Sequence, residues 1–249
     1  SPRPTSATLG WSPACKASPA ACLPPTEPPL LAARGFLLGF GGFLRSPGRH
    51  AGELALPRPR KLVLLLTLLA MDVAIGWAVL DPLGNWLSLA AGADAQVLES
   101  WDIPWPGGEA LLLWAVLEET AFRLWLRPGW RNMAISGAVL AMLLPATGAA
   151  HTLLRMAAMV GAALLASPRH YDWLARHATG AMVHASALIF ALAHLMNFDS
   201  PPSFALVLAL LPQWFGGYVF AYARLRLGFG WGVSLHALHN WLAFLLEAA

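Results

Sequence analysis

The sequence predicts an all-α, polytopic membrane protein, a transmembrane bundle of about seven helices, with six to eight compatible with its length. Composition is the first indication: 57% of the 249 residues are hydrophobic and only 12% are charged, whereas about 25% are charged in soluble domains. Apolar runs that recur along the chain are the second, since about 20 apolar residues form one spanning helix. The composition excludes a disordered chain and argues against a soluble enzyme.

Three regions are expected along the chain. Residues 1–33 are predicted to form a flexible proline-rich tail, because residues 1–29 hold eight of the twenty prolines and no apolar run that could enter a core. The tail also lacks the apolar stretch of a signal peptide. Residues 34–108 are expected to contain a segment along the membrane interface, the first transmembrane helix and an outer loop, and residues 109–249 to form the helical core that carries the chemistry.

Seven apolar segments are predicted to span the bilayer. The third and fourth are short, so they could be fragments of a longer helix or lie tilted in a thin bilayer. In chain order the segments are Leu62–Leu80, Glu109–Leu126, Met133–Ala146, Leu153–Ala166, Ala178–Met196, Phe204–Ala223 and Trp231–Leu246.

Basic residues fall in alternate connections between these segments. No Lys or Arg occurs from Leu62 to Phe122, whereas pairs of arginines follow the second, fourth and sixth segments, the last pair being Arg224 and Arg226. Under the positive-inside rule, this alternation predicts seven helices with a cytoplasmic N-terminus. The expected location is the inner membrane of a bacterium, with the lipid bilayer as a partner. Nucleic acid is not an expected partner, because the basic residues are dispersed along the chain.

Ionisable residues inside the predicted spans are expected to face a partner or a water-filled cavity, because a charge at the middle of a bilayer costs about 2.5–3.5 kcal/mol on insertion scales. The second span contains Glu118, Glu119 and Arg123. Adjacent carboxylates diverge by about 100° around a helix, whereas Glu119 and Arg123, four residues apart, can pair on one face. Such a pair is either a structural clamp between helices or part of a site. Glu118 is left without a local counter-ion and is a candidate general base for water.

Histidines occupy two further spans. His194 lies toward the outer end of the fifth, about 9 Å from its centre at a helical rise of about 1.5 Å per residue. A single histidine in a helix is more often a packing residue than a base, and a position remote from Glu118 would exclude a shared role. In the seventh span, His236 and Asn240 share one face with His239 beside them. Three polar groups on one intramembrane helix face are hard to explain as packing.

Asp72 is an intramembrane acid in the first span. Its carboxylate is expected either to pair with a polar group across the bundle or to line an access path. The sequence assigns no role to His239.

Three short motifs in this order resemble those of the CPBP family of intramembrane proteases, which includes the CAAX prenyl endopeptidases and abortive-infection-like proteins. They are Glu-Glu-xxx-Arg at 118–123, Phe-xxx-His at 190–194 and His-xxx-Asn at 236–240. Each motif alone is weak, but all three in order within hydrophobic segments are a specific match over residues 109–249. The resemblance implies an intramembrane endopeptidase that hydrolyses a peptide bond of a membrane-anchored protein or peptide.

The resemblance also implies residue roles. It assigns Glu118 and His194 to activation of the attacking water, and His236 and Asn240 to stabilisation of the oxyanion. Preorganised donors of this kind are worth about 3–4 kcal/mol each. The remaining motif positions, which have a supporting role, are Glu119 and Arg123.

Metal dependence is left open by the sequence. The usual zinc helix motif, His-Glu-x-x-His, is absent. Glu118, His194 and His236 would still make a set of two histidines and one glutamate for a divalent metal such as zinc, with a position left for water. The expected cofactor is therefore none or one divalent metal ion.

Two other functions are compatible with the same residues. A proton- or cation-coupled transporter would use Glu118, His194 and His236 as an ion path, although no internal repeat of the kind found in many transporters is visible. A catalytically inactive membrane immunity or scaffold protein would keep the fold alone. The substrate is not named by any of these patterns.

Overall fold

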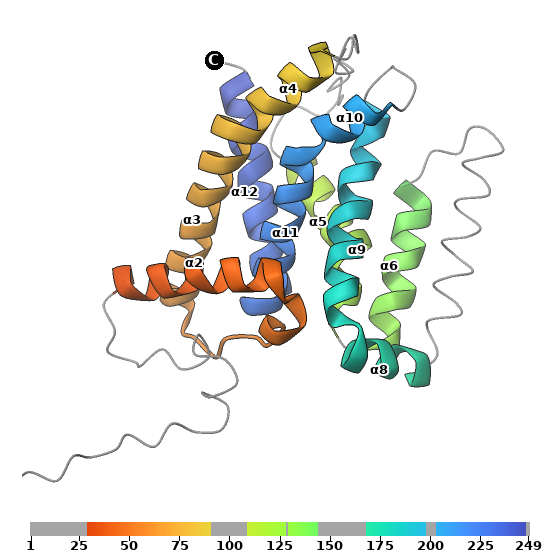
Figure 1. Ribbon diagram of the computed structural model, residues 1–249. Helices are drawn as coiled ribbons and strands as arrows, with labels where there is room; N and C mark the ends of the chain where they lie inside the picture. Colours follow the sequence, from red (N-terminus) through yellow and green to blue (C-terminus); the bar gives the residue numbers. More distant parts are fainter. Residues whose placement is uncertain (1–28, 91–108, 128, 144–167, 198–202, 248–249) are drawn as a thin grey trace, which may run out of the picture.

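The computed structural model describes residues 29–90, 109–127, 129–143, 168–197 and 203–247. Within these ranges 91% of the residues are helical and no strand occurs, which confirms the predicted all-α class. Several helices stand side by side, while α2 and α8 lie across them near one end of the molecule (Figure 1). The helices are α2 (Pro29–Arg45), η2 (Pro47–His50), α3 (Arg58–Asp72), η3 (Val73–Leu80), α4 (Asp81–Ala90), α5 (Glu109–Arg123), η4 (Leu124–Leu126), α6 (Trp130–Leu143), α8 (Pro168–His177), α9 (Thr179–Ala193), η5 (His194–Asn197), α10 (Phe204–Ala209), α11 (Leu211–Arg226) and α12 (Phe229–Glu247).

One helix in the described ranges is long and apolar enough to cross a membrane. It runs for 30 residues from Arg58 to Leu87, through α3, η3 and most of α4, and contains the first predicted span. The predicted sixth span is divided at Leu210, between α10 and α11. The first ten residues after the first predicted span, 81–90, were expected to begin an outer loop but form α4, because the helix continues without a break from η3. The rest of that loop and the predicted fourth span lie outside the described residues. The structure thus supports a helical protein with one helix of membrane-crossing length, and the seven-span bundle stays a prediction.

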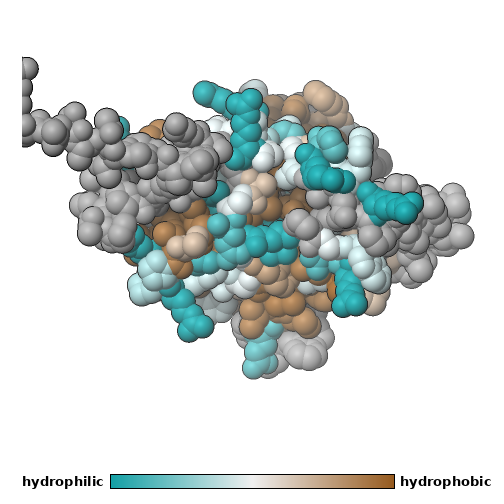
Figure 2. Space-filling view, turned by 90° about the horizontal axis from the view of Figure 1, so that it is seen from below, coloured by the Kyte–Doolittle hydropathy of each residue, from teal (hydrophilic) through white to brown (hydrophobic). Residues whose placement is uncertain are grey.

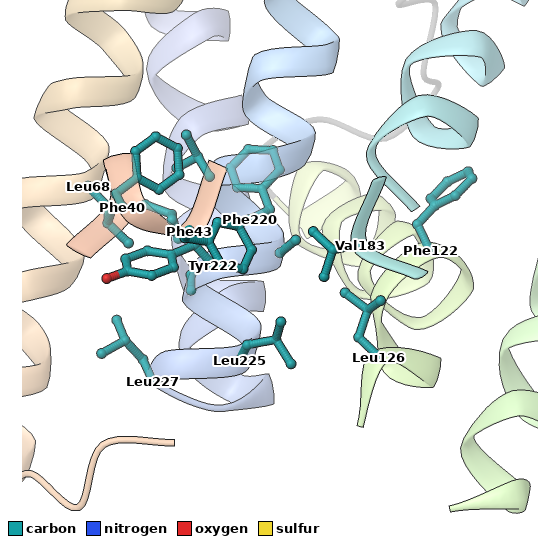
Figure 3. Packing of buried hydrophobic residues seen from close by; sticks show 14 of the residues in the cluster. Phe40, Phe43, Leu68, Phe122, Leu126, Val183, Phe220, Tyr222, Leu225 and Leu227 are labelled. Carbon is teal, nitrogen blue, oxygen red and sulfur yellow. The ribbon is translucent and has the colours of Figure 1, made fainter. Parts of the chain in front are cut away.

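Helix α2 begins at Pro29, inside the stretch predicted to be a flexible tail that ends at residue 33. The difference arises because Phe36, Phe40 and Phe43 recur at helical spacing and are all buried. Their rings surround Tyr222 of α11 at centroid distances of 4.9, 5.3 and 4.9 Å. Figure 3 shows Phe40, Phe43 and Tyr222 of this cluster close together. One face of the segment predicted to lie along the interface therefore packs into the core, while Leu38 on another face is exposed. Its position at a membrane interface stays a prediction.

Helices α9 and α11 approach so closely that a glycine is required between them. A Cβ atom at Gly217 would lie 3.0 Å from the Cα and 3.2 Å from the carbonyl oxygen of Ala187. These are backbone atoms, which cannot rotate away as the end of a side chain can. The contact explains why α11 tolerates a residue that weakens helices.

We expect Gly217→Val to lower the stability of the purified protein in detergent by about 1–3 kcal/mol, because the added carbons overpack the α9–α11 contact. Gly41→Ala in α2 is the matched control, since a Cβ there meets nothing within 4 Å and alanine favours the helix. Thermal unfolding followed by circular dichroism measures both. An unfolding midpoint for Gly217→Val equal to that of the wild type would contradict the assigned contact.

Helix α11 continues through two arginines that were predicted to lie in the following loop. Arg224 and Arg226 are buried, and each donates to a backbone carbonyl. The Arg224 Nε lies 3.3 Å from the Arg123 oxygen at the end of α5, and the Arg226 Nη1 lies 2.7 Å from the Gly52 oxygen. The Arg123 oxygen lies at the end of α5, where carbonyls have no partner within the helix, whereas Gly52 lies in the non-helical segment before α3. The two arginines therefore hold elements together, in addition to any effect on orientation.

Basic residues from several elements gather at this end of the molecule. Lys61 Nζ donates to the Leu227 oxygen at 2.9 Å, and Arg127 Nη2 donates to the Leu225 oxygen at 2.9 Å, so both bind the C-terminal end of α11. Hydrophilic residues spread across this face among apolar ones (Figure 2). The gathering at one end agrees with the alternation in the sequence, and the cytoplasmic side assigned to this end stays a prediction.

Glu53 joins the two cations. It forms ion pairs with Lys61, at 2.8 Å, and with Arg127. Partial burial alone would raise the pKa of Glu53, but the hydrogen bonds and charges of Lys61 and Arg127 outweigh it and hold the pKa below the usual 4.5. A carboxylate whose pKa is depressed on folding stabilises the fold above the unfolded-state pKa and loses this effect as the pH falls through the folded-state pKa.

We expect Glu53→Gln to lower the stability at pH 7 slightly, by less than about 1 kcal/mol, because solvent screens exposed ion pairs. The difference from the wild type should shrink as the pH falls below 4.5 and disappear once Glu53 is protonated in the folded protein. Thermal unfolding of both proteins across this range is the measurement. A difference that persists unchanged at the acid end would show that the carboxylate charge is not responsible.

Candidate active site

The candidate site lies where α12 packs against α5 on one side and α3 on another. In Figure 1, α12 stands behind α11, between α3 and α5. Helix α5 supplies the two adjacent glutamates, α12 supplies two histidines and an asparagine, and α3 supplies Asp72. Residues far apart in the chain thus meet through the packing of three helices.

Glu119 and Arg123 form the ion pair that their spacing predicts. Both side chains are fully buried, and Arg123 Nη1 donates to Glu119 Oε1 at 2.6 Å. The guanidinium lies over the rings of Phe190 and Phe220, at 4.0 and 5.1 Å from their centroids. Its Nε and Nη2 have no hydrogen-bond partner among the described residues, so aromatic faces cover the part of the cation that the carboxylate does not reach. This pair anchors α5 at the site.

His236 lies between the two glutamates. Its Nδ1 is 3.0 Å from Glu119 Oε1, and its Nε2 is 3.3 Å from Glu118 Oε2. The imidazole is buried and stacks on Phe220, with a centroid distance of 4.4 Å and an interplanar angle of 15°. The sequence predicts no counter-ion for Glu118 on its own helix. Its partner in the structure, His236, comes from α12. An imidazole can donate to both carboxylates only when it is protonated.

Glu118 and Glu119 have different environments, as their 100° separation on α5 requires. The Glu118 side chain is 22% exposed, whereas that of Glu119 is 0% exposed. Glu119 therefore serves as the fixed anchor of Arg123 and His236. Glu118 is the carboxylate that a water molecule or a substrate could reach.

His194 is the first residue of η5, directly after α9 ends. Its Nδ1 lies 2.8 Å from the Phe190 carbonyl oxygen, so Nδ1 carries the proton and Nε2 presents a lone pair. The Phe190 ring contacts both imidazoles, with centroids 4.7 Å from His194 and 5.8 Å from His236. His194 is thus near the glutamates and within electrostatic range of Glu118. No hydrogen bond or ion pair joins these two residues in the described structure, and their joint action on one water stays a prediction.

Asn240 lies one turn beyond His236 on α12 and is half-buried. Its carboxamide makes no hydrogen bond to any side chain or backbone group that the structure describes. Its role at an oxyanion stays a prediction.

Asp72 and His239 form a second acid–imidazole pair. His239 Nδ1 lies 2.6 Å from Asp72 Oδ2, which decides between the two expectations for Asp72 in favour of pairing across the bundle. The helix changes from α to π geometry at Val73, immediately after Asp72, and π-helical turns are frequent at functional sites. The sequence signal for this pair was the presence of two unassigned ionisable residues in apolar segments. Their pairing could not be deduced, because nothing in either segment identifies its neighbour.

The expected metal-ligand set of Glu118, His194 and His236 does not assemble. Within the described ranges, no three His, Cys, Asp or Glu side chains form a group that could hold a metal ion. Two members of the set are close together, because His236 Nε2 lies 3.3 Å from Glu118 Oε2. His194 instead contacts the Phe190 carbonyl oxygen through its Nδ1.

Comparison of the chain with protein-family models, with curated proteins and with solved structures finds no match.

Proposed function

We propose that this protein is an intramembrane endopeptidase that cleaves a peptide bond of a membrane-associated protein or peptide. One observation supports this most directly: an accessible carboxylate, Glu118, contacts a buried imidazole, His236, that a second carboxylate holds in place. The three motifs that resemble those of the CPBP family converge at this point. The long apolar helix α3–α4 beside the site favours a substrate held in the membrane.

In the proposed reaction, Glu118 takes one proton from a water molecule while the water oxygen attacks the carbonyl carbon of the substrate. His194 helps to orient the water through the lone pair on its Nε2. The negative charge that develops on the carbonyl oxygen is stabilised by N–H groups of His236 and Asn240. The 3.3 Å contact between His236 Nε2 and Glu118 is long for a hydrogen bond, so Nε2 can donate to an oxyanion beside Glu118 without rotation of the ring.

Identification of new protein N-termini tests the proposal even while the substrate is unidentified. Membranes from bacterial cells that produce the wild type and from cells that produce Glu118→Gln in equal amounts are labelled at free amines and compared by mass spectrometry. The expected result is a set of termini within or next to predicted transmembrane segments that appears only with the wild type. The same termini with both proteins, or no new termini with either, would contradict the proposed activity.

A proton-coupled transporter is the second candidate, because two ionisable pairs, Glu118–His236 and Asp72–His239, lie one turn apart on α12. Proteoliposomes that contain the purified protein and an internal pH dye distinguish the two functions. A transporter or channel would dissipate an imposed pH gradient in a manner that depends on Glu118 or Asp72, whereas a peptidase would leave the gradient intact.

A further inference from the structure

We infer that His239, held by Asp72, is a second catalytic group that protonates the leaving nitrogen when the peptide bond breaks. This inference rests on the proposed peptidase function and extends it to the step that water activation alone does not complete. Neither residue belongs to the three motifs that suggested the activity.

The geometry of the pair is that of an oriented proton donor. The 2.6 Å contact engages His239 Nδ1 with the carboxylate of Asp72, so Nε2 is the nitrogen left to exchange a proton with a ligand. A carboxylate in this position fixes the orientation of the ring and stabilises the imidazolium. The rings of Trp77 and Phe220 flank the imidazole at centroid distances of 5.5 Å each, which restricts its rotation further.

In both acid–imidazole pairs, a buried side chain contacts a partly exposed side chain and holds it in position. In the pair of His236 and Glu118, the histidine side chain is 3% exposed and the glutamate 22%. In the pair of Asp72 and His239, the aspartate is 2% exposed and the histidine 22%. A purely structural link between α3 and α12 would not need His239 to remain accessible.

The two pairs are also neighbours. His236 and His239 are three residues apart on α12, on the same face, and both rings contact Phe220. The buried Arg123 is within electrostatic range of both Glu118 and Asp72. The imidazole that contacts Glu118 and the imidazole that contacts Asp72 therefore lie side by side against the Phe220 ring.

The step balances in atoms, protons and electrons. Water gives one proton to Glu118 and its oxygen forms the new bond to the carbonyl carbon. When the tetrahedral intermediate collapses, the C–N bond breaks, its electron pair goes to nitrogen, and protonated His239 gives its Nε2 proton to that nitrogen. The products are a carboxylic acid and an amine, and the proton on Glu118 then restores His239.

The test compares an amide with an ester at the same position. The probes are a peptide that contains a bond cleaved by the wild type in the N-terminal labelling experiment and its analogue with an ester in place of that amide. An alkoxide leaves far more readily than an amide nitrogen, so the ester depends little on a proton donor. We expect His239→Gln and Asp72→Asn to slow amide hydrolysis by about 100-fold or more and ester hydrolysis by less than about fivefold.

His184→Gln is the matched control. His184 also joins two helices, through a 2.6 Å contact between its Nδ1 and the hydroxyl of Tyr218, and its loss should leave both rates unchanged. Equal slowing of amide and ester, or no slowing of the amide, would overturn the role of His239. If His239→Gln does not fold, Asp72→Asn alone gives the same comparison, because asparagine can still accept a hydrogen bond from Nδ1 but carries no charge. Absence of any Glu118-dependent cleavage would instead overturn the proposed function itself.

Discussion

Replacement of Arg123 with leucine is expected to destabilise the folded protein by about 3–5 kcal/mol, because it leaves the buried carboxylate of Glu119 without its cation. Both side chains are inaccessible to solvent, so water cannot take the place of the lost partner. Arg123 also covers the rings of Phe190 and Phe220, and a leucine does not restore the cation–π contacts. The unfolding midpoint in detergent should fall sharply.

The exposed Arg131 provides the control, since Arg131→Leu should change the midpoint little. The double variant Glu119→Leu with Arg123→Leu should lose less stability than the sum of the single changes, because neither charge is then left alone. An effect of Arg123→Leu no larger than that of Arg131→Leu would show that the ion pair does not support the fold.

Glu118→Gln is expected to reduce kcat for peptide cleavage by about 100-fold to 10,000-fold, the usual contribution of a positioned general base. Glutamine has nearly the same size and can still contact His236, so substrate binding and KM should change little. The unfolding midpoint should also stay close to that of the wild type, because the side chain is partly exposed and Arg123 pairs with Glu119 rather than with Glu118.

Glu119→Gln is the informative comparison, because this residue is adjacent in sequence but has a supporting role. It should lower stability and disturb His236, with both effects visible in the same preparation. If Glu118→Gln keeps full activity while the protein is folded, Glu118 is not the base and the proposed mechanism is wrong.

Much of the local structure could be predicted from residue spacing. The i to i+4 relation of Glu119 and Arg123 predicted their pairing, and the 100° step between adjacent residues predicted that Glu118 would face elsewhere. The long apolar segment from residue 62 predicted the helix of α3 and η3. These features depend on the geometry of a single helix, which the order of residues determines directly.

Relations between helices could not be predicted in this way. The sequence identified His236, His239 and Asp72 as ionisable residues that are unexpected in apolar segments. It could not identify their partners, because Glu119 lies 117 residues before His236 and Asp72 lies 167 residues before His239. The same limit explains why spacing does not reveal that the aromatic residues of α2 surround Tyr222. It also explains why Arg224 and Arg226 are buried in α11 where the sequence predicts a loop.

The sequence by itself therefore determined the helical class of this protein, its low content of charged residues and the few ionisable residues that lie in apolar segments. Burying a charge in such a segment costs free energy. The tertiary structure alone decided which of these residues are partners: Glu118 and Glu119 with His236, and Asp72 with His239. The physical reason is that spacing determines the face of a helix on which a side chain lies. The rotation and register of one helix against another are set by the packing of many apolar contacts at once.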